Sequence, residues 1–297
     1  MANDVKTRRQ IVEALDARGL SVDDLAPIGI RPSLPEYLFQ LWDRRHFIWA
    51  DARHRVATQN SRNRLGAFWL LLRPLLDALM YFLIFGVILS RVFEGVDNVG
   101  AYIVIGVLMF RSSMRSISSG PTILSSGRSM IRAFSFPRAT LPIAAELRDA
   151  LQMQYTIAAV LLLIMVIPPH ESPEWAWLLV APIYVMQFFL NLGISLFTAR
   201  IGFILPDVSQ LMSFVGRFMM YGSGVIFPID RWSDNTIVMT LIQVNPIYHM
   251  IIMYRQALID GVMPSMEHWA MLGVWALGLT LIGFLFFWRG EATYGDE

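Results

Sequence analysis

The sequence contains no cysteine and only one lysine in 297 residues. The absence of cysteine excludes disulfides, thiol nucleophiles and thiolate metal sites. The phosphate-binding loop of ATPases, G-x-x-x-x-G-K-[ST], needs its lysine on the β- and γ-phosphates, and Lys6 is not part of such a pattern. If the protein uses ATP, a different subunit must therefore bind and hydrolyse it.

Metal-ligating side chains are also few. The five histidines are scattered without metal-ligand spacing, at His46, His54, His170, His249 and His268. The apolar segments contain no series of carboxylates at mid-depth, which argues against a proton relay or an ion-coupled cycle. We expect no metal, no cofactor and no catalytic residue in this chain.

Long apolar runs dominate what is present, and 55% of the residues are hydrophobic. Six runs are long enough to cross about 30 Å of hydrocarbon, near 66–90, 99–118, 142–167, 174–199, 208–228 and 267–288. They predict an all-α polytopic membrane protein with six transmembrane helices.

Basic residues indicate the orientation. Eleven Lys or Arg residues precede Leu65, five lie between Arg111 and Arg138, and the 167–174 turn has none. The positive-inside rule then places both termini in the cytoplasm. No cleavable apolar core follows the charged start of the chain, so we expect no signal peptide and a first span that acts as its own anchor.

The polar segment 112–138 lies between the second and third runs and contains four arginines and no acidic residue. Arg128 and Arg132 share a helix face, and Pro137 ends the helix before the chain turns into the third span. We expect a short basic coupling helix on the cytoplasmic side that receives a push from a soluble partner. The alternative is a basic loop that only sets the topology.

The chain divides into four regions. Residues 1–32 form a charged cytoplasmic appendage whose role is not evident. Residues 33–64 have apolar side chains at helical spacing, including Trp42 and Trp49, and end in an Arg-rich linker. They predict an amphipathic helix in the membrane interface, or alternatively a helix of a small soluble domain. Residues 65–290 are the membrane domain, and 291–297 are a cytoplasmic tail.

The segment between 228 and 266 is apolar but broken at Asn245 and Pro246. It predicts two short re-entrant helices before the sixth span, which need protein around them or a cavity beside them. The alternative is a further crossing, which would leave the C-terminus outside.

Ionisable and aromatic side chains in the runs are candidates for contacts along a transport path. Arg73 and Asp77 are one helical turn apart and can pair, whereas Arg217 has no acid near it in the sequence. Arg217 is therefore a candidate pore charge, or else the partner of an acid on another helix. Aromatic rings in the runs can contact a solute or face lipid and other helices; those at helical spacing are Tyr81, Phe85, Phe218 and Tyr221.

Three blocks of the sequence resemble one protein family. Leu65, Gly66, Trp69 and Pro74 open the first span, Phe136-Pro137-Arg138 precedes Leu141-Pro142, and NPIYHMIIMYRQALIDG extends from Asn245 to Gly261. In this order, over about residues 36–290, the blocks resemble the type 2 ABC-transporter permeases that export lipid-linked polysaccharides such as O-antigen, capsule, galactan and teichoic acid.

The resemblance implies a non-catalytic permease of the bacterial inner membrane, surrounded by membrane lipids and without a nucleic-acid partner. Two copies of the chain would assemble with two copies of an ABC ATPase that binds ATP and Mg, and a lipid-linked polysaccharide would pass between them. The expected coupling residues are Arg128, Ser129, Ile131, Arg132, Phe134, Phe136, Pro137 and Arg138. The expected path residues are Tyr81, Phe85, Arg217, Phe218 and Tyr221, and Arg62, Arg64 and Arg73 are the expected contacts for a lipid-pyrophosphate.

Two alternatives remain open. An integral-membrane glycosyl- or acyltransferase acting on a lipid-linked glycan would need paired carboxylates or a histidine at one membrane face, and Glu146 with Asp149 has no neighbouring histidine. A permease for drugs or small lipids would share the architecture but not the polysaccharide-type blocks.

Overall fold

The computed structural model describes residues 32–59, 64–88, 98–133, 136–229 and 235–295. Residues 1–31 of the predicted appendage, together with Arg62 and Phe134, lie outside these ranges. Within them every regular element is helical. The elements are α2 (Leu34–Asp43), α3 (Arg45–Thr58), η2 (Gly66–Phe68), α4 (Trp69–Tyr81), the π-helix η3 (Phe82–Ile88), α5 (Val99–Ser119), η5 (Gly120–Thr122), α6 (Ile123–Ser126), α7 (Arg128–Ala133), α8 (Thr140–Val166), η6 (Trp175–Leu179), α9 (Val180–Ile204), α10 (Val208–Gly222), α11 (Thr236–Val244), α12 (Pro246–Leu258), α13 (Met266–Arg289) and η8 (Glu291–Gly295).

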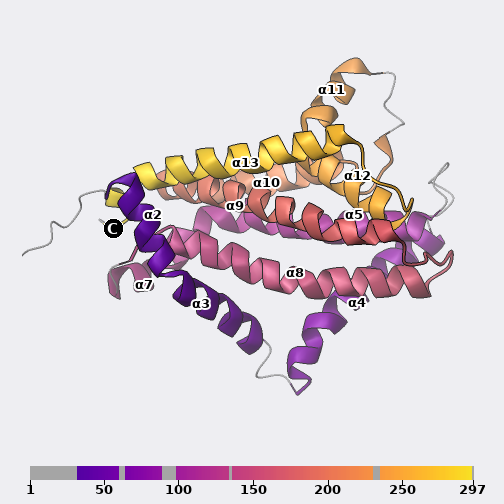
Figure 1. The fold of residues 1–297 in the computed structure, drawn as a ribbon, viewed down its shortest axis with the longest axis horizontal. Helices are drawn as coiled ribbons and strands as arrows, with labels where there is room; N and C mark the ends of the chain where they lie inside the picture. Colours follow the sequence, from indigo (N-terminus) through magenta and orange to yellow (C-terminus); the bar gives the residue numbers. More distant parts are fainter. Residues whose placement is uncertain (1–31, 60–63, 89–97, 134–135, 230–234, 296–297) are drawn as a thin grey trace, which may run out of the picture.

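The long helices α8, α9 and α13 run along the longest axis of the molecule (Figure 1). The short helices α2 and α7 lie at one end of this bundle, whereas α11 and α12 lie at the opposite end. The predicted basic coupling segment and the predicted re-entrant segment therefore lie at opposite ends of the helical bundle.

Four helical segments are long and apolar enough to cross a membrane: Trp69–Ile88, Thr140–Val166, Trp175–Ile204 and Met266–Arg289. A fifth crossing is possible if α11 and α12, which meet at 80°, form one broken span. Helices α5 and α10 occupy the second and fifth predicted runs but do not belong to this set. The fold is thus an all-helical membrane domain, and the count of six crossings stays a prediction.

Helix α5 is the centre of the main hydrophobic core. Its apolar stretch from Ile103 to Phe110 is buried against η3, α8, α9, α10 and α12. A second, smaller cluster at the α2 end joins α2, α6, α9, α13 and η8 through Tyr37, Leu41, Leu124, Leu196, Phe287 and Tyr294. The basic segment is attached to the bundle by this smaller cluster.

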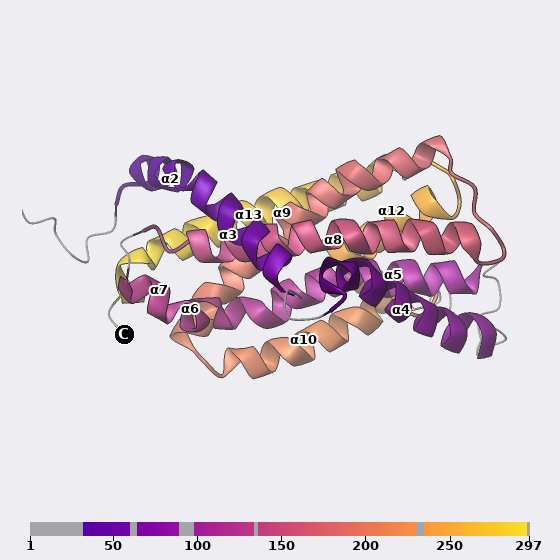
Figure 2. The same ribbon diagram turned by 90° about the horizontal axis from the view of Figure 1, so that it is seen from below.

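The single amphipathic helix predicted within residues 33–64 is wrong, because the chain bends at Arg44 between α2 and α3. The two halves have different tertiary contacts. Helix α2 buries Tyr37 in the smaller cluster, whereas α3 lies across α8 and buries Ile48, Ala52 and Val56 (Figure 2). One straight helix could not reach both surfaces. Trp42 and Trp49 face outward, as a membrane-interface helix requires.

Candidate functional site: the basic segment and its pocket

The basic segment is a chain of short helical turns. It leaves α5 through the 3₁₀ turn η5, continues through α6, and ends with the six-residue α7. Its hydroxyl groups are bonded to its own backbone: Ser125 Oγ donates to the carbonyl oxygen of Thr122 (2.9 Å), and Ser126 Oγ donates to that of Ile123 (3.0 Å). These local bonds favour tight turns over one continuous helix.

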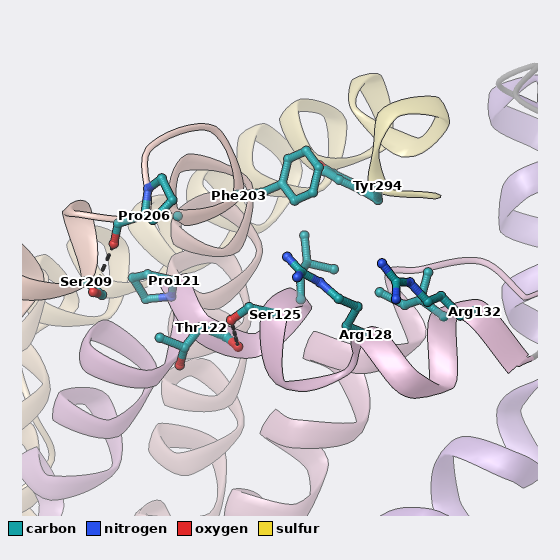
Figure 3. Close-up of a pocket in the computed structure, with 12 residues that line it drawn as sticks. Pro121, Thr122, Ser125, Arg128, Arg132, Phe203, Pro206, Ser209 and Tyr294 are labelled. Carbon is teal, nitrogen blue, oxygen red and sulfur yellow. Dashed lines mark hydrogen bonds between the residues drawn. The ribbon is translucent and has the colours of Figure 1, made fainter. Parts of the chain in front are cut away.

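A pocket of about 310 Å³ lies between this segment, the turn from α9 to α10 and η8. The side chains of Arg128 and Arg132 extend from α7 towards Phe203 and Tyr294 (Figure 3). The remaining lining residues are Pro121, Thr122, Leu124, Ser125, Ile131, Gly202, Pro206 and Ser209. The lining therefore combines two cations and several hydroxyl groups with aromatic and aliphatic walls, and none of the described lining residues is acidic.

The structure brings three of the eight predicted coupling residues together at this pocket, namely Arg128, Ile131 and Arg132. Ser129 is exposed on α7 but is not part of the lining. Phe136 is half-buried and Pro137 is buried, which suits residues that shape the turn into α8. Arg138 has a different set of contacts.

Arg138 belongs to a three-way junction that the sequence did not predict. Glu291 Oε1 accepts a hydrogen bond from the backbone N–H of Arg138 (2.8 Å) and lies 3.4 Å from its guanidinium. Glu291 Oε2 accepts from the Tyr37 hydroxyl (2.7 Å), whose oxygen accepts in turn from the backbone N–H of Ala139 (3.1 Å). The junction joins α2, the start of α8 and η8.

Burial determines the titration of this junction. It raises the pKa of Glu291, while the hydrogen bonds from Arg138 and Tyr37 act in the opposite direction. Burial also raises the pKa of Tyr37, and the negative charge of Glu291 adds to this shift. The Tyr37 hydroxyl therefore keeps its proton and remains a donor. The only sequence signal was an acid two residues after Arg289, where the last helix ends.

The predicted path residues lie on two helical segments. Tyr81 and Phe85 are half-buried, pack against the main core and stack on each other with ring centroids 6.4 Å apart. Phe218 and Tyr221 are exposed on α10. Arg217, on the same helix, places its guanidinium 4.5 Å from the centre of the Phe214 ring.

The predicted pairing of Arg73 with Asp77 is wrong. Asp77 forms an ion pair with Arg111 of α5 instead, because α4 and α5 pack together at this level. Arg73 is exposed on α4, and Arg64 is exposed just before it. Of the three predicted lipid-pyrophosphate contacts, the two described residues are therefore accessible.

At the end of the molecule opposite the pocket, Arg255 is a buried cation held by backbone carbonyls. Its guanidinium donates to Tyr102 O (3.1 and 3.2 Å), Gly224 O (2.8 Å) and Val225 O (2.8 Å). The same group lies 3.3 Å from the centre of the Tyr102 ring. Arg255 thus ties α12 to α5 and to the turn that follows α10.

No protein-family model matches the chain. An O-antigen export system permease protein, RfbA, from Klebsiella pneumoniae is 22% identical over 222 residues, which cover 75% of this chain and 83% of that protein. A protein of the same name from Myxococcus xanthus is 20% identical over 228 residues, covering 77% of this chain and 86% of that protein. The resemblance to the type 2 ABC permeases of polysaccharide export is confirmed. Together with the apolar helices, it makes this chain an integral membrane protein.

The carboxylates that a transferase would need are engaged in helix packing. Glu146 is buried in α8 and accepts a hydrogen bond from Ser116 Oγ of α5 (3.0 Å). Asp149 forms an ion pair with Arg115 of α5 (3.0 Å). Among the described residues, no group of three or more His, Asp or Glu side chains is arranged to hold a metal ion. These contacts join α5 to α8 and leave the permease as the better supported alternative.

Proposed function

We propose that the chain is the permease subunit of an ATP-driven exporter that moves a lipid-linked polysaccharide from the cytoplasm across the bacterial inner membrane. The main support is the similarity to O-antigen export permeases over 75% to 77% of the chain. The arginine-lined pocket on the predicted coupling segment supports the same function. The glycan is O-antigen-like or a galactan used in cell-wall biogenesis. A separate ATPase binds ATP and Mg, because this chain has a single lysine and no phosphate-binding loop.

In this proposal, two copies of the chain form the path around a two-fold axis, since one chain with six crossings is too small to enclose a polymer. Both termini and the pocket face the cytoplasm, where two ATPase copies bind. The outward-facing residues Phe214, Phe218 and Tyr221 form an apolar strip on α10 that would line the path opposite the second copy. Single cysteines at Phe218 and Tyr221 should then react with water-soluble thiol reagents in the working complex. Protection of both positions in every state would remove α10 from the path.

The pocket offers a direct connection between the coupling segment and α10. Gly202 of α9 lies so close to Pro121 of η5 that a side chain at this position would overlap the Pro121 backbone. Pro206, just before α10, and Ser209, in its first turn, form part of the pocket wall. When ATP binding closes the ATPase pair, a push on the segment would therefore move the start of α10 rather than be absorbed in a flexible loop.

The decisive experiment reverses the charge of the pocket. Replacing Arg128 and Arg132 together by Glu should abolish export and weaken co-purification of the ATPase, because like charges at a binding face repel. The variant Arg128→Lys with Arg132→Lys keeps both charges and should retain ATPase binding. Membrane insertion of both variants is checked by fractionation.

Normal export by the Glu variant would place the ATPase contact elsewhere, with α2 and α3 as the next candidates. ATP hydrolysis by the purified chain alone would contradict the permease proposal.

A further inference from the structure

The Glu291 side chain joins distant segments at the pocket end of the molecule. It is 2% exposed, and it accepts hydrogen bonds from two elements that are far from it in sequence: Tyr37 lies 254 residues away and Arg138 lies 153 residues away. It also lies outside the candidate membrane spans. The carboxylate therefore joins three parts of the chain by itself.

The partners of Glu291 explain why an acid is suited to this position. The backbone N–H groups of Arg138 and Ala139 immediately precede α8, and the side chain of Ala139, the N-cap residue, cannot accept a hydrogen bond. Glu291 satisfies the first N–H, and the Tyr37 oxygen satisfies the second. Negative charge is also favourable beside the start of a helix. Two residues from distant segments therefore hold the turn that leads into α8, whose own first N–H groups are bonded to the carbonyls of Pro137 and Arg138.

The surroundings make the junction stiff. Tyr37 is fully buried, and its ring centroid lies 6.0 Å from that of Phe284 in α13. One helical turn beyond Phe284, the indole N–H of Trp288 donates to Pro32 O, just before α2 (3.1 Å). Helix α2 is thus held to α13 at two points in addition to Glu291.

We propose that Glu291 is a positioning residue for energy coupling. It locks α2, the start of α8 and the end of α13 to the coupling segment, so that all three move together when the ATPase pushes. This rests on the proposed function. A loose junction would let Arg138 and the segment move without α2 and α13, and ATP would be hydrolysed without export.

The test compares three variants in the complete complex with its ATPase. Tyr37→Phe removes the donor to Glu291 and the acceptor for the Ala139 N–H. Glu291→Gln keeps the shape and one acceptor, but an NH₂ donor replaces one carboxylate oxygen, so the Tyr37 O–H or the Arg138 N–H loses its acceptor. The third variant combines both changes. The matched control is Tyr184→Phe, which removes a hydroxyl that donates to Ala150 O (2.7 Å) away from the junction.

Three quantities are measured: co-purification of the ATPase, the rate of ATP hydrolysis, and the amount of polysaccharide that reaches the surface of the bacterium that makes the complex. We expect each single variant to keep assembly and hydrolysis but to lower export per ATP by about tenfold, which corresponds to one hydrogen bond to a charged group. Because the residues act as one unit, the double variant should export no less per ATP than the single variant that exports less. The control should match the wild type.

The outcomes separate the two proposals. If the wild-type chain has no ATPase partner, the proposed function fails. If the wild type exports normally and the variants also export normally per ATP, Glu291 has no positioning role. A parallel loss of assembly, hydrolysis and export would likewise overturn the inference, because it would show that the junction only stabilises the fold. Additive effects in the double variant would show that the two residues act independently and would also overturn the inference, which requires them to act as one unit.

Discussion

Arg255 allows a sharp test of how the structure is held together at the end of the molecule opposite the pocket. Replacing it by Met keeps much of the side-chain length but removes the donors that the guanidinium directs to the carbonyls of Tyr102, Gly224 and Val225. A buried carbonyl left without a donor costs about 1–3 kcal/mol. Part of this loss is offset, because the variant no longer buries a guanidinium, which itself costs several kcal/mol.

We therefore expect a net loss of about 3 kcal/mol, because several carbonyls lose a donor at about 1–3 kcal/mol each and the relief of burying the guanidinium offsets only part of that loss. The change should lower the midpoint of thermal unfolding in detergent by roughly 5–10 °C, measured by fluorescence-detected size-exclusion chromatography. Arg217→Met is the control, because Arg217 is exposed and only stacks on Phe214. An unchanged midpoint for Arg255→Met would show that the carbonyls are satisfied in another way and would refute the argument.

Three further predictions use the same measurement. Gly193→Ala should cost about 1–3 kcal/mol, because a Cβ would lie 2.5 Å from the backbone of α13, whereas Gly278→Ala, with no atom within 4 Å, should be neutral; equal midpoints would contradict this packing. Burial raises the pKa of Glu291 above that of the same group in the unfolded chain. The folded state therefore holds this proton more tightly and loses stability as the pH rises through the folded pKa. Glu291→Gln should flatten that slope, and an unchanged slope would assign it to other groups. Asp77→Asn breaks the ion pair with Arg111 of α5 and should lower the free energy of unfolding by about 1 kcal/mol, whereas Arg73→Gln should change it little. Similar losses for the two variants would favour a pair between Arg73 and Asp77 instead.

The sequence predicted well what depends on local pattern. The apolar runs near 142–167 and 267–288 match the helices Thr140–Val166 and Met266–Arg289, because a run of this length has few other stable forms in a membrane. The break at Asn245 also follows from local chemistry. Its side chain caps α12 by accepting from the backbone N–H of Ile247 (3.0 Å), and the next residue is a proline in the first turn.

The failed predictions concern the choice between partners. Spacing along one helix shows that Arg73 can reach Asp77, but it cannot show that α5 brings Arg111 closer. The same limit applies to Tyr37 and Glu291, whose contact spans almost the whole chain and follows no short motif. The bend at Arg44 is similar, since it results from two packing surfaces and not from a helix breaker.

Helix α5 connects the two ends that these side chains stabilise. Near its start, the Tyr102 carbonyl accepts from Arg255, and its last residue, Ser119, leads directly into the segment that lines the pocket. With 21 residues, α5 is about 30 Å long, and its buried middle packs against α9, α10 and α12. Close packing transmits small displacements because it leaves little free space to absorb them. In an ATP-driven cycle, a push at the pocket would therefore reach Arg255 through α5 itself, and the turn after α10, held by the same guanidinium, would move with it.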